Sequence, residues 1–213
     1  MRGALWCRVR SLGIGVQLAV RGIVLPTVLT GALLTGAPLV SAATLRAQDG
    51  PSLVILVRHA EKASQTERDP SLSEIGQSRA VALSQALTHM APNAIIVTSF
   101  KRTAETAAPT AAKFGITPTV VPIAGSSASH VAAVAEAVRK QRGVVLVVGH
   151  SNTVTAIAKA LGGPSLPDIC DASYATMYVL EPAAGGSAVK LLTAQFGAAD
   201  AVGATACAGM APR

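Results

Sequence analysis

The apolar positions from residue 52 onward form two kinds of segment that alternate along the chain. Short apolar runs are typical of strands, and these lie at 52–57, 93–99, 117–123 and 143–149. Longer segments with apolar residues at helical spacing lie at 74–90, 102–115, 130–141 and 152–162. Two late runs, 175–182 and 187–196, predict a pair of strands joined by a turn at Gly185-Gly186. The alternation predicts an α/β fold, a three-layer sandwich with a largely parallel central sheet.

Individual residues indicate where some of these elements end. Ser73 precedes the first helix and can cap it, and Gly115 can close the second helix. Pro109 is expected to interrupt that second helix, because proline lacks the N–H that a helix interior uses. The run 143–149 has no polar alternation, so it is expected to be a central strand that is buried on both faces.

The N-terminal residues have a different pattern, which is typical of an export signal. The start, MRGALWCRVR, is basic without any acid, and an apolar stretch follows from Gly22 to Val40. Small residues then provide cleavage sites near residue 42 or 47. An uncleaved membrane anchor is the alternative, although prolines and glycines within the stretch weaken a spanning helix. We expect a signal peptide over 1–47 and one exported domain over 51–213, periplasmic or secreted, without stable membrane association after cleavage.

The charge of the chain does not favour a nucleic-acid partner. The 213 residues have a formal net charge of +7. Four of the 18 Lys and Arg residues precede residue 42, where there is no acid, so the remainder holds 14 basic against 11 acidic residues. That remainder contains no basic cluster interleaved with aromatic residues, which is the usual footprint of a nucleic-acid interface.

Two cysteines follow the signal. Cys170 and Cys207 are an even pair in a compartment that is expected to be oxidising, so they are expected to form a disulfide. Two unrelated small apolar residues are the alternative. No CxxC or His-Cys cluster indicates a metal site.

Arginines and histidines stand where three of the expected strands end. Arg58 and His59 follow the first strand, Arg102 follows the second, and His150 follows the fourth. Parallel strands present their carboxyl ends at one edge of the sheet, so we expect these four side chains to meet. Two guanidinium groups beside two imidazoles form a pocket for a phosphate dianion, in which a neutral imidazole can attack phosphorus. The positive neighbours should lower the pKa of such a histidine and keep it neutral.

The segments that carry these residues resemble a known family. VRHAEK at 57–62, SFKRTAETA at 99–107 and VVGHSN at 147–152 resemble, in this order, the motifs of the histidine phosphatase superfamily, also called phosphoglycerate mutase-like. LSEIGQSRA at 72–80 also matches the family's segment between the first two strands. The resemblance spans about residues 52–162 and implies a phosphoglycerate mutase-like fold.

The resemblance also implies a role for each residue at the strand ends. His59 is implied to be the phosphorylated nucleophile, and Arg58, Arg102 and His150 are implied to form the phosphate pocket. The implied intermediate is a phosphohistidine that water hydrolyses. Ser151 stands directly after the second histidine, where it can donate to phosphate or cap the next helix. Neither a metal nor a cofactor is expected, because the arginines and histidines supply the electrostatics.

The sequence departs from the family pattern at two points. Ala60 stands where glycine is common. The acid that commonly follows the third strand in mutase-like members is missing, since IAGSSASHVAAVAEA holds no acid before Glu136, and Ser151 stands where the acid-phosphatase branch has an aspartate. Glu61, two residues after the nucleophile, is therefore our candidate for the proton donor, and pairing with a neighbouring cation is its alternative.

Other polar residues near the motifs are expected to have lesser roles. His130 begins a helix and could reach the pocket rim, but a solvated position is favoured. Glu105 lies in the first turn of a helix, where a carboxylate favours the dipole. Lys62 and Lys101 flank the site and can steer anionic substrates, with solvation as an equal alternative.

Together these features predict an exported, metal-independent phosphatase that acts on phosphomonoesters or phosphorylated protein side chains. Its partner is expected to be a small phosphorylated substrate or a phosphoprotein. No long insertion between His59 and His150 provides a lid, which disfavours a phosphoglycerate mutase-type phosphotransferase, since a mutase must hold its intermediate away from water. A non-catalytic phosphate-binding pseudo-enzyme is the other alternative; the missing acid supports it, and the intact nucleophile opposes it.

Overall fold

The computed structural model describes residues 50–183 and 188–200. The strands are β1 (Pro51–Arg58), β2 (Ala94–Thr98), β3 (Thr119–Val121), β4 (Gly143–Gly149), β5 (Thr176–Glu181) and β6 (Lys190–Gln195). The helices are α1 (Glu74–Ala86), the 3₁₀ turn η1 (Leu87–His89), α2 (Lys101–Phe114), α3 (Ser127–Arg139) and α4 (Thr153–Ala160). The predicted signal over 1–47, the turn at 185–186 and Cys207 lie outside the described residues. Within those residues, none of the helices is long and apolar enough to span a membrane.

The strands form one sheet in the order β3-β2-β4-β1-β5-β6. Strands β1 to β4 pair with one another in parallel, and β5 and β6 are added antiparallel at the β1 edge of this group. The predictions of a largely parallel α/β sheet and of a late strand pair are therefore confirmed. β4 pairs with both β1 and β2, and its last five residues are buried, which confirms that 143–149 is a central strand.

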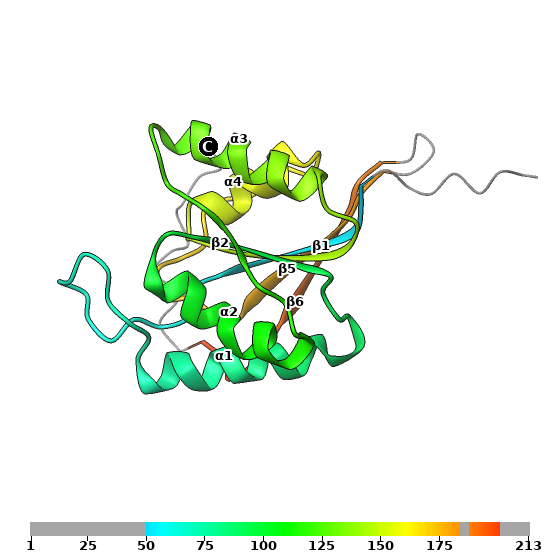
Figure 1. Ribbon diagram of the computed structural model, residues 1–213. Coiled ribbons are helices and arrows are strands. Elements are labelled where there is room, and N and C mark those ends of the chain that lie inside the picture. Colours follow the sequence, from blue (N-terminus) through cyan, green and yellow to red (C-terminus); the bar gives the residue numbers. More distant parts are fainter. Residues whose placement is uncertain (1–49, 184–187, 201–213) are drawn as a thin grey trace, which may run out of the picture. The chain divides into compact units, whose positions relative to one another are not determined.

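Helices cover both faces of the sheet, as Figure 1 shows: α1 and α2 lie on one face, and α3 and α4 on the other. A hydrophobic core lies on each face of the sheet. Alternate residues of β1 pack in one core or the other, because successive side chains of a strand point to opposite faces. Val54 and Leu56 pack in the core that contains α3 and α4 residues, and Ile55 and Val57 pack in the core with α1 and α2 residues. This burial on both faces explains why the strand reads as an uninterrupted apolar run.

Two expected helix ends are confirmed. The Ser73 hydroxyl accepts a hydrogen bond from the amide of Gly76 at 3.1 Å, which caps α1. Gly115 ends α2 with a φ of 65°, a conformation that costs glycine little. Gly76 has a second reason to be glycine, since a Cβ there would lie 2.3 Å from the carbonyl oxygen of Glu61. α1 can therefore approach the loop that follows β1.

Two expectations about the helices are wrong. α2 is not interrupted at Pro109 but runs from Lys101 to Phe114. Proline removes one helical hydrogen bond, and the buried face of α2, which includes Thr106 and Ala107, holds the helix together across it. α3 begins three residues earlier than expected, because Ser126 caps it by accepting a hydrogen bond from the amide of Ser129 at 3.1 Å.

Candidate active site

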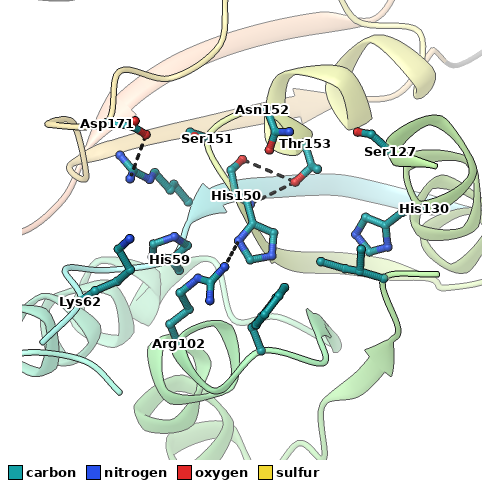
Figure 2. A pocket seen from close by; sticks show the side chains of 13 residues that line it. His59, Lys62, Arg102, Ser127, His130, His150, Ser151, Asn152, Thr153 and Asp171 are labelled. Atoms are coloured by element: carbon teal, nitrogen blue, oxygen red, sulfur yellow. Dashed lines mark hydrogen bonds and ion pairs between the residues drawn. The ribbon is translucent and has the colours of Figure 1, made fainter. Parts of the chain in front are cut away.

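One edge of the sheet holds a pocket of about 390 Å³ that Arg58, His59, Arg102 and His150 line together (Figure 2). Arg58 ends β1 beside Gly149 of β4, and the amide of His59 donates to the Gly149 carbonyl at 2.9 Å. The parallel pairing of β1 and β4 thus places both histidines at the same edge. The structure brings the four residues together as the sequence predicts, while their chemical roles stay predictions.

The imidazole of His59 is held in one tautomer. Its Nδ1 lies 2.8 Å from the carbonyl oxygen of Ala60. A carbonyl can only accept, so Nδ1 carries the proton and Nε2 has the free lone pair. The amide of Ala60 in turn donates to the hydroxyl of Thr106 at 2.9 Å, and Ala60 is fully buried. Alanine at this position therefore fits a tight, well-supported turn.

Both pocket histidines are neutral. Burial lowers the pKa of His59 from its ordinary value of 6.5 to about 3, and the positive charges of Arg58, Arg102 and Lys62 act in the same direction. Burial also lowers the pKa of His150 to about 3, followed by the effects of His59 and the nearby cations. A neutral imidazole with a free Nε2 is the state that a nucleophile requires.

His150 lies beside His59, with ring centroids 5.4 Å apart. Nη2 of Arg102 donates to its Nδ1 at 3.4 Å, so the proton of His150 resides on Nε2, which donates to the Thr98 hydroxyl at 3.1 Å. The ring of Phe100 meets it edge-on at a centroid distance of 5.5 Å. These contacts fix the second imidazole against the first.

The guanidinium of Arg58 is buried and is held by a segment more than a hundred residues away. Nη1 donates to the carbonyl oxygens of Cys170 and Ser173, at 2.8 and 3.0 Å. Nη2 lies 3.5 Å from the Asp171 carboxylate, and the guanidinium carbon lies 4.1 Å from the centre of the Tyr174 ring. Asp171 and Tyr174 thus belong to the site, and no motif in the sequence indicated them.

Arg102 is positioned from the start of α2. Its guanidinium carbon lies 4.0 Å above the Phe100 ring, and Nη1 lies 3.8 Å from the Asp69 carboxylate. Burial lowers the pKa of Arg102, although a guanidinium stays charged near neutrality. The Nε atoms of Arg102 and Arg58 are buried and find no hydrogen-bond partner among the described residues. Arg58 and Arg102 both line the pocket, where guanidinium groups can donate to phosphate oxygens.

The structure corrects the expectation for Glu61. Its carboxylate accepts two hydrogen bonds from Nε of Arg79, at 2.9 and 3.0 Å, and Nη2 of Arg79 lies 2.8 Å from Oε1. Glu61 is not among the described residues that line the pocket. A carboxylate that is held by a buried arginine and does not line the pocket is not placed to reach a leaving oxygen there. Glu61 therefore supports the loop after β1 and is not assigned as the proton donor.

His130 is the second correction. It was expected to be solvated, but only 2% of its surface is exposed, and it lines the pocket from the first turns of α3. Its Nδ1 lies 3.2 Å from the Pro122 carbonyl oxygen, and its Nε2 has no hydrogen-bond partner among the described residues. The signal that could have found it is the Ser126 cap, which starts the helix early enough to turn His130 inward.

The remaining candidates divide between the pocket and the scaffold. Lys62 and Ser151, which were expected to act on an anion, line the pocket, and Asn152 lines it beside them. Glu105 instead accepts a hydrogen bond from the amide of Leu72 at 2.7 Å, which gives it a structural role. Among the described residues, no three His, Cys, Asp or Glu side chains cluster as metal ligands would. The pocket itself brings two arginines together with the imidazoles of His59 and His150.

Comparisons with known proteins agree with this geometry. A sequence model of the histidine phosphatase superfamily (branch 1) matches residues 54–123, which confirms the resemblance that the motifs indicated. The matched segment includes Arg58, His59 and Arg102, and the fold adds His150 to them. No curated protein matches the sequence.

Solved structures with the same fold cover about two thirds of this chain. The protein histidine phosphatase SixA, complexed with tungstate, has a TM-score of 0.53 at 14% identity and covers 67% of this chain and 96% of its own. Mycobacterial hydrolase 1 has a TM-score of 0.52 at 20% identity, with coverage of 70% and 99%. Mycobacterial glucosyl-3-phosphoglycerate phosphatase Rv2419c has a TM-score of 0.51 at 18% identity, with coverage of 68% and 97%. These likenesses confirm the predicted fold.

Proposed function

We propose that this protein is an exported, metal-independent phosphomonoester hydrolase of the histidine phosphatase type, in which His59 is the nucleophile. The observation that carries the proposal is a neutral imidazole with its proton on Nδ1, which lies in one pocket with two arginines and a second histidine. The match to the superfamily model supports the same chemistry. The name of the neighbour SixA suggests phosphorylated protein histidine as a second substrate class.

The proposed reaction has two displacement steps. Nε2 of His59 attacks phosphorus, and the bond from phosphorus to the leaving oxygen breaks with its electron pair on that oxygen. The Ala60 carbonyl accepts from Nδ1 and stabilises the positive charge of the phosphorylated ring. Arg58 and Arg102 bind the phosphoryl oxygens, and His150 joins them when its Nε2–H turns from the Thr98 hydroxyl to phosphate. A water oxygen then attacks phosphorus, the phosphorus–nitrogen bond breaks, and its electrons return to Nε2 as inorganic phosphate leaves.

His130 takes the place of the missing acid in this proposal. It lines the pocket, it is buried, and its Nε2 has no partner among the described residues. An imidazole can both give and accept a proton near neutral pH. In the first step imidazolium of His130 gives a proton to the leaving oxygen, and in the second step the neutral ring takes one from the attacking water.

Turnover of p-nitrophenyl phosphate by residues 48–213 tests the main proposal. We expect hydrolysis that persists in EDTA and labelled phosphate on the protein that is acid-labile and base-stable. His59→Ala should abolish both turnover and labelling, whereas His89→Ala, at an exposed histidine, should leave both unchanged. Absence of turnover, or label that persists in His59→Ala, would exclude His59 as a catalytic nucleophile.

The role of His130 is tested by the dependence of rate on the leaving group. His130→Gln should slow hydrolysis of alkyl phosphates by about 10² to 10⁴, the usual range for general acid–base catalysis. The rate at which p-nitrophenyl phosphate phosphorylates His59 should be largely spared, because its phenolate leaves without protonation, whereas the second step, which is common to both substrates, should slow for both. Equal losses in the phosphorylation rate with both substrates would show that His130 only shapes the pocket.

Export is proposed from residues 1–47, whose basic start, apolar stretch and small residues are typical of a signal peptide. Expression of the full chain followed by N-terminal sequencing of protein from the cell envelope and the medium tests it. We expect a mature chain that begins near residue 43 or 48. A chain that keeps residue 1 and stays in the cytoplasmic fraction would contradict export.

A further inference from the structure

A second hollow, of about 510 Å³, lies between α3 and α4. Its walls include the small and aliphatic side chains of Ala128, Val131, Ala132, Ala156 and Leu166. We call it the α3–α4 groove. Apart from Asn152, its walls lie outside the motifs in the sequence, because they come from α3, α4 and the segment that follows α4.

The α3–α4 groove continues the phosphate pocket. Ser127, the first residue of α3, lines both hollows, and so does Asn152, which precedes α4. Figure 2 shows these two side chains on the side of the pocket where α3 and α4 begin. A molecule that places a phosphate among the arginines and histidines can therefore extend between Ser127 and Asn152 into the groove.

The direction of phosphoryl transfer also places the leaving group toward the α3–α4 groove. In phosphoryl transfer the attacking and leaving atoms lie roughly in line through phosphorus, so the leaving oxygen faces away from His59. Lys62 lies on the His59 side, where its charge acts on the pKa of His59. His130 lies on the opposite side, where its charge acts on the pKa of His150, and Figure 2 shows the same order. The leaving oxygen thus faces α3, where the groove begins.

We propose that the α3–α4 groove binds the organic part of the substrate, and that this part is an elongated, uncharged apolar group such as an aliphatic chain. The proposal rests on the phosphatase function above. The charged side chains among the described groove residues are Lys159 and Asp168, of opposite sign, and the Thr155 hydroxyl donates to Asp168 at 3.5 Å. The groove therefore has no net charge with which to select a second phosphate, and its remaining wall is largely apolar.

The length of the groove sets the length of the group that fits it. Asn152 lies at one end of α4 and Lys159 in its last turn, seven residues apart, which corresponds to about 10 Å along the helix axis. An extended chain with carbon–carbon bonds of about 1.5 Å covers that distance with about eight carbons. The affinity of the groove for a chain should therefore rise with chain length up to about eight carbons and not beyond.

Alkylphosphonates test the inference without requiring catalysis. The affinity of the protein is measured for methyl-, butyl-, hexyl- and octylphosphonate. Calorimetry gives it directly, and competitive inhibition of p-nitrophenyl phosphate turnover gives it a second time. Affinity should rise by about two- to fourfold for each added methylene, where fourfold corresponds to about 0.8 kcal/mol per buried methylene. An affinity that does not change with chain length, measured by calorimetry, overturns the proposal. If the protein does not hydrolyse p-nitrophenyl phosphate but phosphonate affinity still rises with chain length, the phosphatase function is rejected. The binding of apolar chains in the groove is then retained.

A pair of neighbouring alanines on α3 provides the matched variants. Ala132 lines the groove and Ala133 does not, and both are exposed, so each should tolerate a phenylalanine without loss of folding. Ala132→Phe should remove the gain from chain length and leave the affinity for methylphosphonate, which does not reach into the groove, unchanged. Ala133→Phe should behave as the unmodified protein. An unchanged chain-length dependence in Ala132→Phe would show that the chain binds elsewhere.

Discussion

Nε of Arg79 donates to both carboxylate oxygens of Glu61, at 2.9 and 3.0 Å, and so joins α1 to the loop that carries the nucleophile. Nη1 of Arg79 donates at the same time to the carbonyl oxygens of Phe196 and Ala198. Arg79 is only 5% exposed, and Asp200 adds a second carboxylate 3.9 Å from Nη2. One buried arginine thus ties the chain after β1 to the chain after β6.

Replacement of Arg79 should therefore destabilise the whole domain. Arg79→Met leaves Glu61 without its buried partner and frees the carbonyl groups of Phe196 and Ala198, so the free energy of unfolding should fall by about 3 kcal/mol. Urea unfolding measures it. Arg68→Met, at an exposed arginine in the loop after β1, is the matched control and should change stability little.

Substitution of Glu61 distinguishes a structural role of this carboxylate from a role in catalysis. Glu61→Gln should lower stability but slow alkyl and aryl phosphates by the same small factor, because Glu61 does not line the pocket. A loss confined to alkyl phosphates would restore Glu61 as the proton donor. An equal stability loss in Arg79→Met and Arg68→Met would show that the buried ion pair contributes nothing.

Substitutions of Arg102 and of its neighbour Lys101 compare a cation inside the pocket with a cation on the surface. Arg102→Ala removes a donor that lies beside His150, so kcat/KM for p-nitrophenyl phosphate should fall by about 10² to 10³, the usual cost of one transition-state donor. Lys101→Ala should have little effect, because Lys101 is exposed. Arg102→Lys should recover little activity, since an ammonium lacks the bidentate fork. Full activity in Arg102→Ala would exclude the predicted phosphate role.

The lowered pKa of His59 has consequences for pH. Its pKa falls from 6.5 to about 3 on folding, so between these values the unfolded chain binds a proton that the native protein does not. The free energy of unfolding should therefore decrease as pH falls from about 6.5 toward about 3. Urea unfolding at pH 7 and pH 5 should show a smaller pH dependence in His59→Gln than in the unmodified protein.

Nuclear magnetic resonance of the imidazole nitrogens gives an independent measure. At pH 5 the His59 ring should still be neutral, with its proton on Nδ1, because burial lowers its pKa to about 3. A His59 that titrates near 6.5 would contradict the burial that lowers its pKa, and so would a neutral ring with its proton on Nε2.

Cys170 links the site to the predicted disulfide. Cys170 is disulfide-bonded, and its carbonyl oxygen accepts from Nη1 of Arg58. Cys207 lies outside the described residues, so its pairing with Cys170 stays a prediction. The loop would close about 38 residues, which the chain-entropy model values at about 4 kcal/mol. Peptide mapping of unreduced exported protein should find the cross-link, and reduction should lower both stability and kcat/KM. Two free thiols in that protein would refute the pairing.

The sequence by itself determined the fold class and the four residues at the strand ends. Apolar runs and helical spacing are local patterns, and a parallel sheet brings the carboxyl ends of its strands to one edge. Residues such as Arg58, His59 and His150, which directly follow strands, are therefore placed by connectivity alone. The Ser73 cap and the Gly115 helix end were predictable for the same reason, since their partners lie within one turn.

Only the tertiary structure decided which groups surround those residues. Glu61 pairs with Arg79, 18 residues away, and Arg58 donates to carbonyl groups 112 and 115 residues away. The local Ser126 cap sets where α3 begins, but the packing of α3 on the sheet is what buries His130 in the pocket. Such contacts depend on how helices and loops pack, and a single sequence does not encode them as a local pattern. Packing therefore determined that Glu61 is a support and that His130 reaches the pocket.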